Sequence, residues 1–462
     1  MKFYNRENEI ILFNERLSRN GFELIVFSGR RRVGKTELIR HLDSIDLYFY
    51  ITKETSFSIL SQFEDKLRVY FNEDFIQFRD WNDFFKYLIS KARISGLNIV
   101  FDEFQNFEFV DKSFFSIFQR YLEDISRDDL NLKFICTGSY INMIKNIFNS
   151  SASPLYGRKT AELILKPLKF KYCVEILKDL HHLKNNEDII NIYSLFSGIP
   201  RYYQLTEKEK SKNFNDILDK LLFSQISPLK SEVREVFFED IINTKKEYLS
   251  ILKAISKGNN TNSKIAEFSG IKQTSLPGYL DELENIYEVI ERRVPITDDE
   301  LKSKKGRYFL KDSFLLFWFR FIESNKSNYE FGNFEVIKEN ILNLYSDFVG
   351  KNTFENLARE YIQKNNKNFI TGSWWSGSEE IDICAYDLNN NFIFGECKWT
   401  NKKVGFSLYN DLLKKIKIGK FSNVSKIYLF SKSGFEKNLI EKADELNIEL
   451  IDLDLLVDTL VN

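Results

Sequence analysis

One eight-residue motif limits the fold of this chain more than any other feature. Residues 29–36 read Gly-Arg-Arg-Arg-Val-Gly-Lys-Thr and satisfy the pattern Gly-x4-Gly-Lys-[Ser/Thr] at every required position. An apolar run (ELIVFS, 23–28) precedes the motif, and an amphipathic stretch (ELIRHL, 37–42) follows it. Glycines let backbone N–H groups close around a phosphate at the amino end of a helix. The motif therefore predicts a strand, a phosphate-binding loop and a helix, which together open an α/β sheet.

The residue types in this loop predict ATP with Mg²⁺ as the ligand. Lys35 would reach the β- and γ-phosphate oxygens, and the Thr36 hydroxyl would be a Mg²⁺ ligand. The predicted nucleotide-binding residues of the loop are Gly29, Arg30, Arg31, Arg32, Val33, Gly34, Lys35 and Thr36.

An apolar strand that ends in two acids supplies the second half of such a site. Residues 98–103 read Asn-Ile-Val-Phe-Asp-Glu, and an acid at the carboxyl end of a parallel strand faces the ligand crevice. Asp102 would complete the Mg²⁺ shell, while Glu103 would orient or deprotonate the attacking water. The second carboxylate favours ATP hydrolysis over phosphoryl transfer to a small molecule.

Two further polar residues follow in the chain. Ser139 ends the stretch Thr-Gly-Ser and would sense the γ-phosphate. Arg158 ends Leu-Tyr-Gly-Arg and would stabilise transition-state charge, in its own subunit or in a neighbouring one. The alternative for each is an ordinary solvated loop residue.

These motifs together resemble the archaeal ATPase family, a branch of the AAA+-related signal-transduction ATPases with numerous domains. The resemblance also includes FYNRENEIIL (3–12) before the first strand and GIPRYY (198–203) further on. It implies a P-loop ATPase with a helical lid, in which Arg6 and Pro200 lie on the adenine side of the nucleotide. The alternative for Pro200 is a simple helix-ending turn.

Length and pattern divide the chain into four expected domains, because 462 residues exceed one ordinary domain. Five apolar runs that alternate with helical patterns over residues 1–165 predict a parallel sheet between helices, the P-loop ATPase core. The predicted strands are 23–28, 47–52, 97–101, 132–137 and 161–165. A helical lid would occupy 166–245, and short helices with a hairpin over 246–325 predict a winged helix-turn-helix. A second α/β domain would occupy 326–462.

Composition excludes several classes of protein. The 66 basic and 67 acidic residues nearly cancel, so a nucleic-acid surface must be a local patch. Three His and four scattered Cys argue against a Ser-His-Asp triad, a multi-His metal site and a disulfide framework. The most apolar run, 314–322, is too short for a membrane span, and the first residues lack a signal-peptide pattern. We therefore expect a cytoplasmic protein with no membrane contact.

The middle module carries one basic patch. Its expected recognition helix, Ser275–Asn285, is acidic, whereas the loop of the hairpin is basic. The loop cluster could neutralise several phosphates without reading bases, so DNA is an expected partner. The alternative is a packing module between the ATPase and the C-terminal domain. The cluster consists of Lys302, Lys304, Lys305 and Arg307.

Carboxylates and a lysine form a second constellation near the C-terminus. Asp382 lies in a short alternating strand, and Glu396 and Lys398 lie two residues apart in the next one, so the latter two share a face. If the strands pair through residues 387–391, Asp382 would join them. Two carboxylates could then bind Mg²⁺ or Mn²⁺ while Lys398 polarises water, and Glu355 on an upstream helix could approach.

This Asp…Glu-x-Lys pattern resembles the PD-(D/E)XK nuclease superfamily and the restriction-endonuclease-like domain that often follows archaeal ATPases. The resemblance implies that Asp382, Glu396 and Lys398 are catalytic and that Glu355, Asp382 and Glu396 hold the metal. Two departures stand out: Cys397 replaces a β-branched residue, and the next helix offers no evident Gln. Six lysines between residues 402 and 420 could guide a nucleic-acid backbone, or could simply form a solvated helix face.

Our preferred hypothesis is a nucleotide-switched enzyme, in which ATP hydrolysis moves the lid and gates metal-dependent DNA cleavage. One alternative is an ATP-regulated DNA-binding or signalling scaffold without nuclease activity. Another is an antitoxin-like or defence sensor that binds a protein partner and not DNA. A homo-oligomer is compatible with each of these hypotheses.

Overall fold

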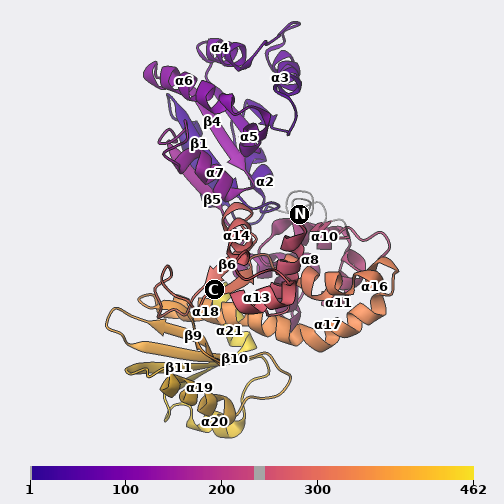
Figure 1. Cartoon of the computed structure of the whole chain (residues 1–462), viewed down its shortest axis with the longest axis vertical. Coiled ribbons are helices and arrows are strands. Elements are labelled where there is room, and N and C mark those ends of the chain that lie inside the picture. Colours follow the sequence, from indigo (N-terminus) through magenta and orange to yellow (C-terminus); the bar gives the residue numbers. More distant parts are fainter. Residues whose placement is uncertain (1–2, 231, 234–244) are drawn as a thin grey trace. The chain divides into compact units, whose positions relative to one another are not determined.

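The chain forms two compact units in the computed structural model (Figure 1). The structure describes residues 3–230, 232–233 and 245–462. One unit runs from the start of the described chain to Pro167 and includes Asn285–Glu288, and the other comprises Leu168–Glu284 and Val289–Asn462. The predicted lid, 166–245, thus belongs almost wholly to the second unit, and its residues 231 and 234–244 lie outside the described residues. The four predicted domain boundaries stay a prediction.

The first unit contains a five-stranded parallel sheet of order β2-β3-β4-β1-β5. Three inner strands are buried along their whole length, which explains why they read as continuous apolar runs. All five predicted strands are confirmed. Their bounds are β1 Glu23–Gly29, β2 Leu47–Tyr50, β3 Leu97–Asp102, β4 Leu132–Gly138 and β5 Ala161–Leu165.

Helices flank this sheet, and its two faces have separate apolar cores (Figure 1). Successive side chains of a strand point to opposite faces. Phe101 and Phe134 accordingly belong to a large aromatic cluster, whereas Val100 and Ile135 pack with Leu38 in a smaller one. The helices are α1 Glu7–Leu17, α2 Lys35–Arg40, α3 Ser56–Phe71, α4 Trp81–Ala92, α5 Phe107–Val110, α6 Ser113–Arg127 and α7 Ile141–Asn149.

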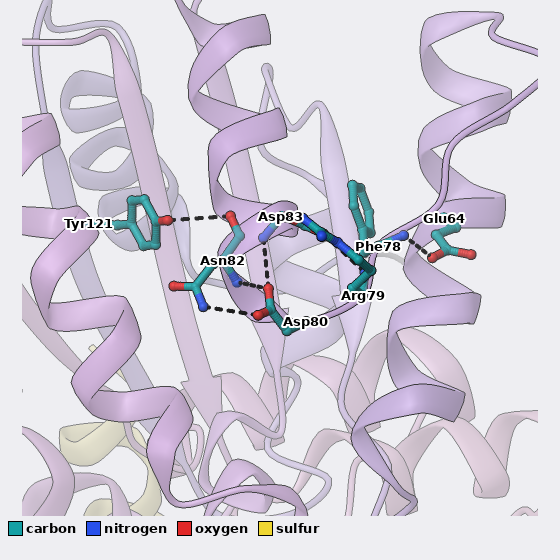
Figure 2. A network of polar contacts seen from close by, with 7 residues as sticks. All are labelled: Glu64, Phe78, Arg79, Asp80, Asn82, Asp83 and Tyr121. Carbon is teal, nitrogen blue, oxygen red and sulfur yellow. Dashed lines mark hydrogen bonds and ion pairs between the residues drawn. The ribbon is translucent and has the colours of Figure 1, made fainter.

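Polar contacts hold the connection between α3 and α4 in place (Figure 2). The Asp80 carboxylate caps α4 by accepting the backbone N–H groups of Asn82 at 2.9 Å and Asp83 at 3.1 Å. The backbone N–H of Phe78 donates to Glu64 on α3 at 2.6 Å. These bonds satisfy buried and helix-terminal polar groups. Ile76 and Phe78 of the connection are buried in the large aromatic cluster.

The second unit begins with helices and a small hairpin. Three short helices precede an antiparallel strand pair, as the pattern over 246–325 predicts. The apolar run 314–322 is buried, apart from half-buried Arg320. The elements are α8 Phe170–His181, α9 Asn186–Phe196, α10 Pro200–Lys208, α11 Phe214–Leu221, α12 Lys246–Ser256, α13 Asn262–Ser269, α14 Leu276–Asp281, β6 Ile290–Arg293, β7 Arg307–Leu310, α15 Ser313–Phe317, α16 Lys326–Glu330 and α17 Phe334–Val349.

A mixed five-stranded sheet of order β12-β11-β10-β9-β8 completes the second unit. The pairs β8–β9 and β9–β10 are antiparallel, while β10–β11 and β11–β12 are parallel. The predicted hairpin that carries Asp382 and Glu396 is therefore confirmed. The elements are α18 Glu355–Asn365, β8 Ile370–Ser376, β9 Glu379–Tyr386, β10 Phe392–Lys398, α19 Phe406–Ile418, β11 Val424–Ser431, α20 Lys437–Lys442, β12 Ile448–Asp452 and α21 Leu453–Val461.

An ion pair connects helix α9 of the predicted lid to this sheet. The side chain of Lys432 is 6% exposed, and its ammonium lies 2.7 Å from the Glu187 carboxylate on α9. The backbone N–H of Lys432 donates to the carbonyl of Lys398 at 3.0 Å, at the end of β10. The lid helices and the C-terminal sheet thus form part of one unit. Across the described residues, no helix is both long and apolar enough to cross a membrane.

Candidate functional site

The loop between β1 and α2 has the backbone of an anion cradle. Gly34 adopts φ 98° immediately before α2, in the left-handed region that favours glycine. At Gly29 a Cβ atom would lie 2.8 Å from the carbonyl oxygen of Leu165 and 3.1 Å from Val33, so only glycine fits there. The two glycines of the motif therefore let the loop turn closely into the amino end of α2.

Lys35 is the buried cation of this loop. Its ammonium donates to the carbonyl oxygens of Gly29 at 2.7 Å and Arg30 at 3.2 Å, and to the Ser139 hydroxyl at 3.0 Å. Burial lowers the pKa of Lys35, while the charges of Glu103 and Asp102 oppose that shift. A bound phosphate would supply further negative charge and favour the ammonium form.

Glu103 lies in the same network. The Ser139 hydroxyl donates to Glu103 Oε1 at 2.5 Å, and the amide of Gln105 donates to the other carboxylate oxygen. Glu103 has φ 56°, which turns the chain sharply at the end of β3. The structure therefore brings together the predicted residues Lys35, Glu103 and Ser139.

Asp102 ends β3 beside them and is 4% exposed. Its Oδ1 accepts the backbone N–H of Glu103 at 3.0 Å, and its Oδ2 accepts the hydroxyl of Tyr48. Burial raises the pKa of Asp102, and the Tyr48 hydrogen bond opposes the rise. The oxygens of Thr36 and Asp102 are the hard ligands that Mg²⁺ prefers, so the donor chemistry fits that ion.

Arg158 is not brought to the loop within its own chain. Its guanidinium lies 2.5 Å from the Glu123 carboxylate on α6. Thr160, just beyond it, donates its backbone N–H to Leu24 near the start of β1, whereas the loop follows the other end of that strand. Arg158 thus pairs with Glu123 in this structure, and its predicted catalytic role, in its own subunit or in a neighbouring one, stays a prediction.

The two residues predicted beside the adenine have local roles in this structure. Arg6 is 6% exposed and donates to the carbonyl of Lys166 at 2.6 Å and to Glu9 at 3.0 Å. Pro200 is the first residue of α10, in the other unit. Its fixed φ suits the first helical position, so a helix-start role accounts for this proline. A role beside the adenine stays a prediction for both residues.

The second site lies where β9 and β10 separate. Their pairing ends at Gly395 opposite Ile383, and the next free N–H on β10, that of Cys397, donates to Asp382 Oδ2 at 2.9 Å. The carboxylate thus takes the place of a backbone acceptor. Glu396 lies directly beside this junction on β10.

Glu396 is 2% exposed and forms an ion pair at 2.6 Å with Lys415 on α19. Burial raises the pKa of Glu396 to about 8, the Asp382 charge adds to the rise, and Lys415 opposes it. Burial also raises the pKa values of Asp382 and Glu355. Burial thus outweighs the ion pair, and the cluster favours protonated carboxylates when no cation is bound.

Glu355 at the start of α18 is electrostatically close to this cluster. The Asp382 charge is the second cause, after burial, of its raised pKa. Arg359 bridges the two residues: its guanidinium lies 3.7 Å from Glu355 and donates to the Asp382 carbonyl at 2.6 Å. In the described part of the chain, no three His, Cys, Asp or Glu side chains converge to hold a metal ion. The predicted ligands are near one another but are not assembled as a metal site, because Lys415 and Cys397 already occupy two of their carboxylates.

A cavity of about 470 Å³ opens beside Glu396 and is lined by four lysines and four acidic residues. Glu396, Lys398 and Lys415 all line it, so the two residues of the Glu-x-Lys motif face one space as predicted. Lys398 is exposed, whereas Glu396 is buried at the bottom. The other charged lining residues are Glu379, Lys403, Asp411, Lys414 and Glu436.

The hairpin loop of the middle module packs against the C-terminal sheet. Arg307 lies 2.8 Å from the Glu380 carboxylate and 4.6 Å above the ring of Trp375. The indole N–H of Trp375 donates to the carbonyl of Lys305 at 2.9 Å. Arg307 is therefore engaged within the protein, and its predicted contact with phosphate stays a prediction. Lys302 and Lys304 are exposed.

Several residues of these sites carry no motif signal. Tyr48 and Gln105 reach Asp102 and Glu103 only through the fold. Lys415 is one of six similar lysines in the sequence, and nothing in their spacing singles it out. Arg359 lies one helical turn after Glu355, which is the one local signal that pairs them.

Family comparisons match two parts of the chain. Residues 3–206 match a family described as an ATPase domain predominantly from Archaea. Residues 318–411 match a family described as archaeal and bacterial proteins of unknown function, DUF234. An uncharacterised protein of Methanocaldococcus jannaschii is 35% identical over 464 aligned positions, covering 97% of this chain and 99% of that protein.

Two solved structures are similar in fold. A Walker-type ATPase of Pyrococcus abyssi has a TM-score of 0.53 at 19% identity and covers 69% of this chain and 96% of its own. The ORC2 protein of Aeropyrum pernix has a TM-score of 0.46 at 14% identity and covers 74% of this chain and 96% of its own. At these identities the first similarity shows the fold alone, and no argument rests on the second.

Proposed function

The chain belongs to the archaeal ATPase family and joins its ATPase domain to a C-terminal DUF234 domain, and from this premise we propose a nucleotide-controlled nuclease. The P-loop unit would bind and hydrolyse ATP. The C-terminal domain would bind DNA and cleave it with a divalent cation. Each half of the proposal rests on its own cluster of residues.

For ATP hydrolysis, the chain supplies a cation, a water-directing carboxylate and a hydroxyl that connects them. Lys35 would bind the β- and γ-phosphates, and Ser139 would exchange its contact with Lys35 for one with the γ-phosphate. Glu103 would direct the attacking water once Ser139 and Gln105 release its carboxylate. Thr36 and Asp102 would hold Mg²⁺, which neutralises charge on the phosphates when bound.

One observation carries the nuclease half: Asp382 and Glu396 lie where β9 and β10 separate, and Glu396 lines a cavity together with four lysines. Three carboxyl groups with raised pKa values favour binding a cation, because a bound cation stabilises their ionised forms. A divalent ion there would activate water and polarise a phosphodiester. Lys398, exposed at the cavity, would stabilise charge on the phosphate.

Coupling between the two halves would use the lid. Because Lys432 joins α9 to the end of β10, any movement of α9 would be transmitted to the strand that carries Glu396 and Lys398. A second link lies in the P-loop unit, where Glu288 accepts the backbone N–H of Ile141 at 3.0 Å, two residues after Ser139. Glu288 is followed directly by the segment that leads to β6.

A cleavage assay tests the proposal. Wild type, Lys398→Ala and Lys402→Ala would be incubated with supercoiled and linear DNA, with Mg²⁺ or Mn²⁺, and with or without ATP. We expect wild type and Lys402→Ala to cleave and Lys398→Ala to lose cleavage, because exposed Lys402 is not among the residues lining the cavity. Equal cleavage by all three proteins would refute the nuclease assignment.

A second candidate is an ATP-controlled DNA-binding switch that does not cut. The Glu396–Lys415 ion pair favours it, because a metal would have to displace Lys415. In that case neither wild type nor either variant would cleave DNA under any of these conditions, although ATP hydrolysis would persist. The affinity for DNA would fall steeply as the salt concentration rises. A flat salt dependence would instead favour a protein partner over DNA.

A further inference from the structure

The edge strand β2 carries a tyrosine that faces the nucleotide site. Leu47 and Phe49 are buried in the large aromatic cluster. Tyr48 lies between them and packs on the opposite face, against the smaller cluster that includes Val33 of the loop and Leu38 of α2. The alternation of side chains along β2 therefore directs the Tyr48 ring to the side of the sheet where the loop and α2 lie.

The Tyr48 hydroxyl contacts one of the side chains that would hold Mg²⁺. It donates to Oδ2 of Asp102. Tyr48 comes from β2 and Asp102 from the end of β3, so this phenol connects two separate elements beside the site. No sequence motif links the two residues.

The contacts determine how the Asp102 carboxylate is oriented. Asp102 is 4% exposed, and a buried carboxylate requires hydrogen-bond donors. The Glu103 N–H binds Oδ1 at 3.0 Å and Tyr48 binds Oδ2, so each oxygen has one donor and keeps a lone pair. The strand is itself held, because Lys66 on α3 donates to the Tyr48 carbonyl at 2.9 Å.

We propose that Tyr48 is a positioning residue of the nucleotide–Mg²⁺ site, whose hydroxyl holds the Asp102 carboxylate in the orientation that receives the metal. A preorganised ligand loses less entropy on binding the ion. Lys35 contacts Gly29, Arg30 and Ser139 without Tyr48. Tyr48 therefore acts on the part of the nucleotide affinity that depends on Mg²⁺, and not on the contacts of the loop with phosphate.

A matched pair of variants tests this role. Tyr70 on α3 is also a tyrosine whose hydroxyl donates to a carboxylate, Asp46 at 2.6 Å, so Tyr70→Phe removes the same kind of bond elsewhere in the unit. The full-length wild type, Tyr48→Phe and Tyr70→Phe would be titrated with a fluorescent ATP analogue, once in excess Mg²⁺ and once in EDTA. Thermal unfolding in EDTA would show that both variants are folded.

We expect the affinity ratio between Mg²⁺ and EDTA to fall about tenfold in Tyr48→Phe, as for the loss of one hydrogen bond to a charged group. The ratio should not change in Tyr70→Phe, and the affinity in EDTA should stay within about twofold for both. An unchanged ratio in Tyr48→Phe, or an equal loss in Mg²⁺ and EDTA, would overturn the proposal. A larger ratio would also overturn it, because Tyr48 would then compete with the metal.

Discussion

The P-loop site and the carboxylate site differ in the partners of their buried charges. The Lys35 ammonium donates to the neutral oxygens of Gly29, Arg30 and Ser139, and the charges of Glu103 and Asp102 favour its ionised form. Glu396 has Lys415 as its partner at 2.6 Å, yet burial favours its protonated form. A phosphate at the first site would replace neutral contacts of Lys35, whereas a cation at the second would have to displace Lys415.

The two sites also differ in the groups that build them. Backbone groups build the P-loop, so its shape persists without a ligand. Side chains build the carboxylate cluster, and without a cation they bind one another or the backbone N–H of Cys397. Substitutions that change one site at a time therefore test this difference.

The largest effect is expected from Lys35→Ala. Removing the ammonium should weaken ATP binding by about 100-fold or more, because charged hydrogen bonds to phosphate are lost. Titration with a fluorescent ATP analogue measures this loss, and exposed Lys112→Ala provides the control. Tight ATP binding by Lys35→Ala would show that the loop is not the nucleotide site.

Asp382→Ala should separate the two activities. We expect Mg²⁺-dependent DNA cleavage to disappear while ATP hydrolysis stays within about twofold, because Asp382 belongs to the other unit. Nicking and phosphate-release assays measure the two activities in parallel. Exposed Asp444→Ala should keep both, and unchanged cleavage by Asp382→Ala would contradict the assigned site.

The pH dependence of stability should reveal the buried carboxylates. The pKa of Glu396 rises from 4.5 to about 8 on folding, so its stabilising contribution is complete below pH 4.5 and is lost as pH rises through 8. In EDTA, the free energy of unfolding should therefore fall by roughly 3–4 kcal/mol more in wild type than in Glu396→Gln between pH 5 and 8.

Denaturant unfolding, followed by tryptophan fluorescence, measures this slope. Glu441→Gln is the control, because Glu441 is exposed on α20 and pairs only loosely with Lys437 at 3.6 Å. It should keep the wild-type slope. If Glu396→Gln also kept that slope, Glu396 would be ionised in the folded protein, and burial would not outweigh its ion pair with Lys415.

The smallest effect concerns the partner of Glu396. Lys415→Met should lower the free energy of unfolding at pH 7 by about 1–2 kcal/mol, because a buried carboxyl group loses its donor. Lys414→Met should change it by less than about 0.5 kcal/mol, since Lys414 and its partner Asp411 are both exposed. Equal effects of the two substitutions would mean that the buried ion pair is energetically like a surface pair.

Much of the fold could be predicted, because its signals are local. Five apolar runs predict the strands of the parallel sheet, and the hairpin of β9 and β10 follows from alternation and a turn. The ion pairs of Arg158 and Arg307 could not be predicted. Each guanidinium pairs with a carboxylate far away in sequence, Glu123 and Glu380, and no local pattern indicates such pairs.

The sequence by itself determined the phosphate-binding loop, because glycine, lysine and threonine at that spacing have few other uses between a strand and a helix. Only the tertiary structure decided which partners surround the acids: Tyr48 beside Asp102 and Lys415 beside Glu396. A backbone cradle depends on residues that are consecutive in the chain. A cluster of buried side chains depends on which strands and helices pack together, and packing is a property of the whole folded unit.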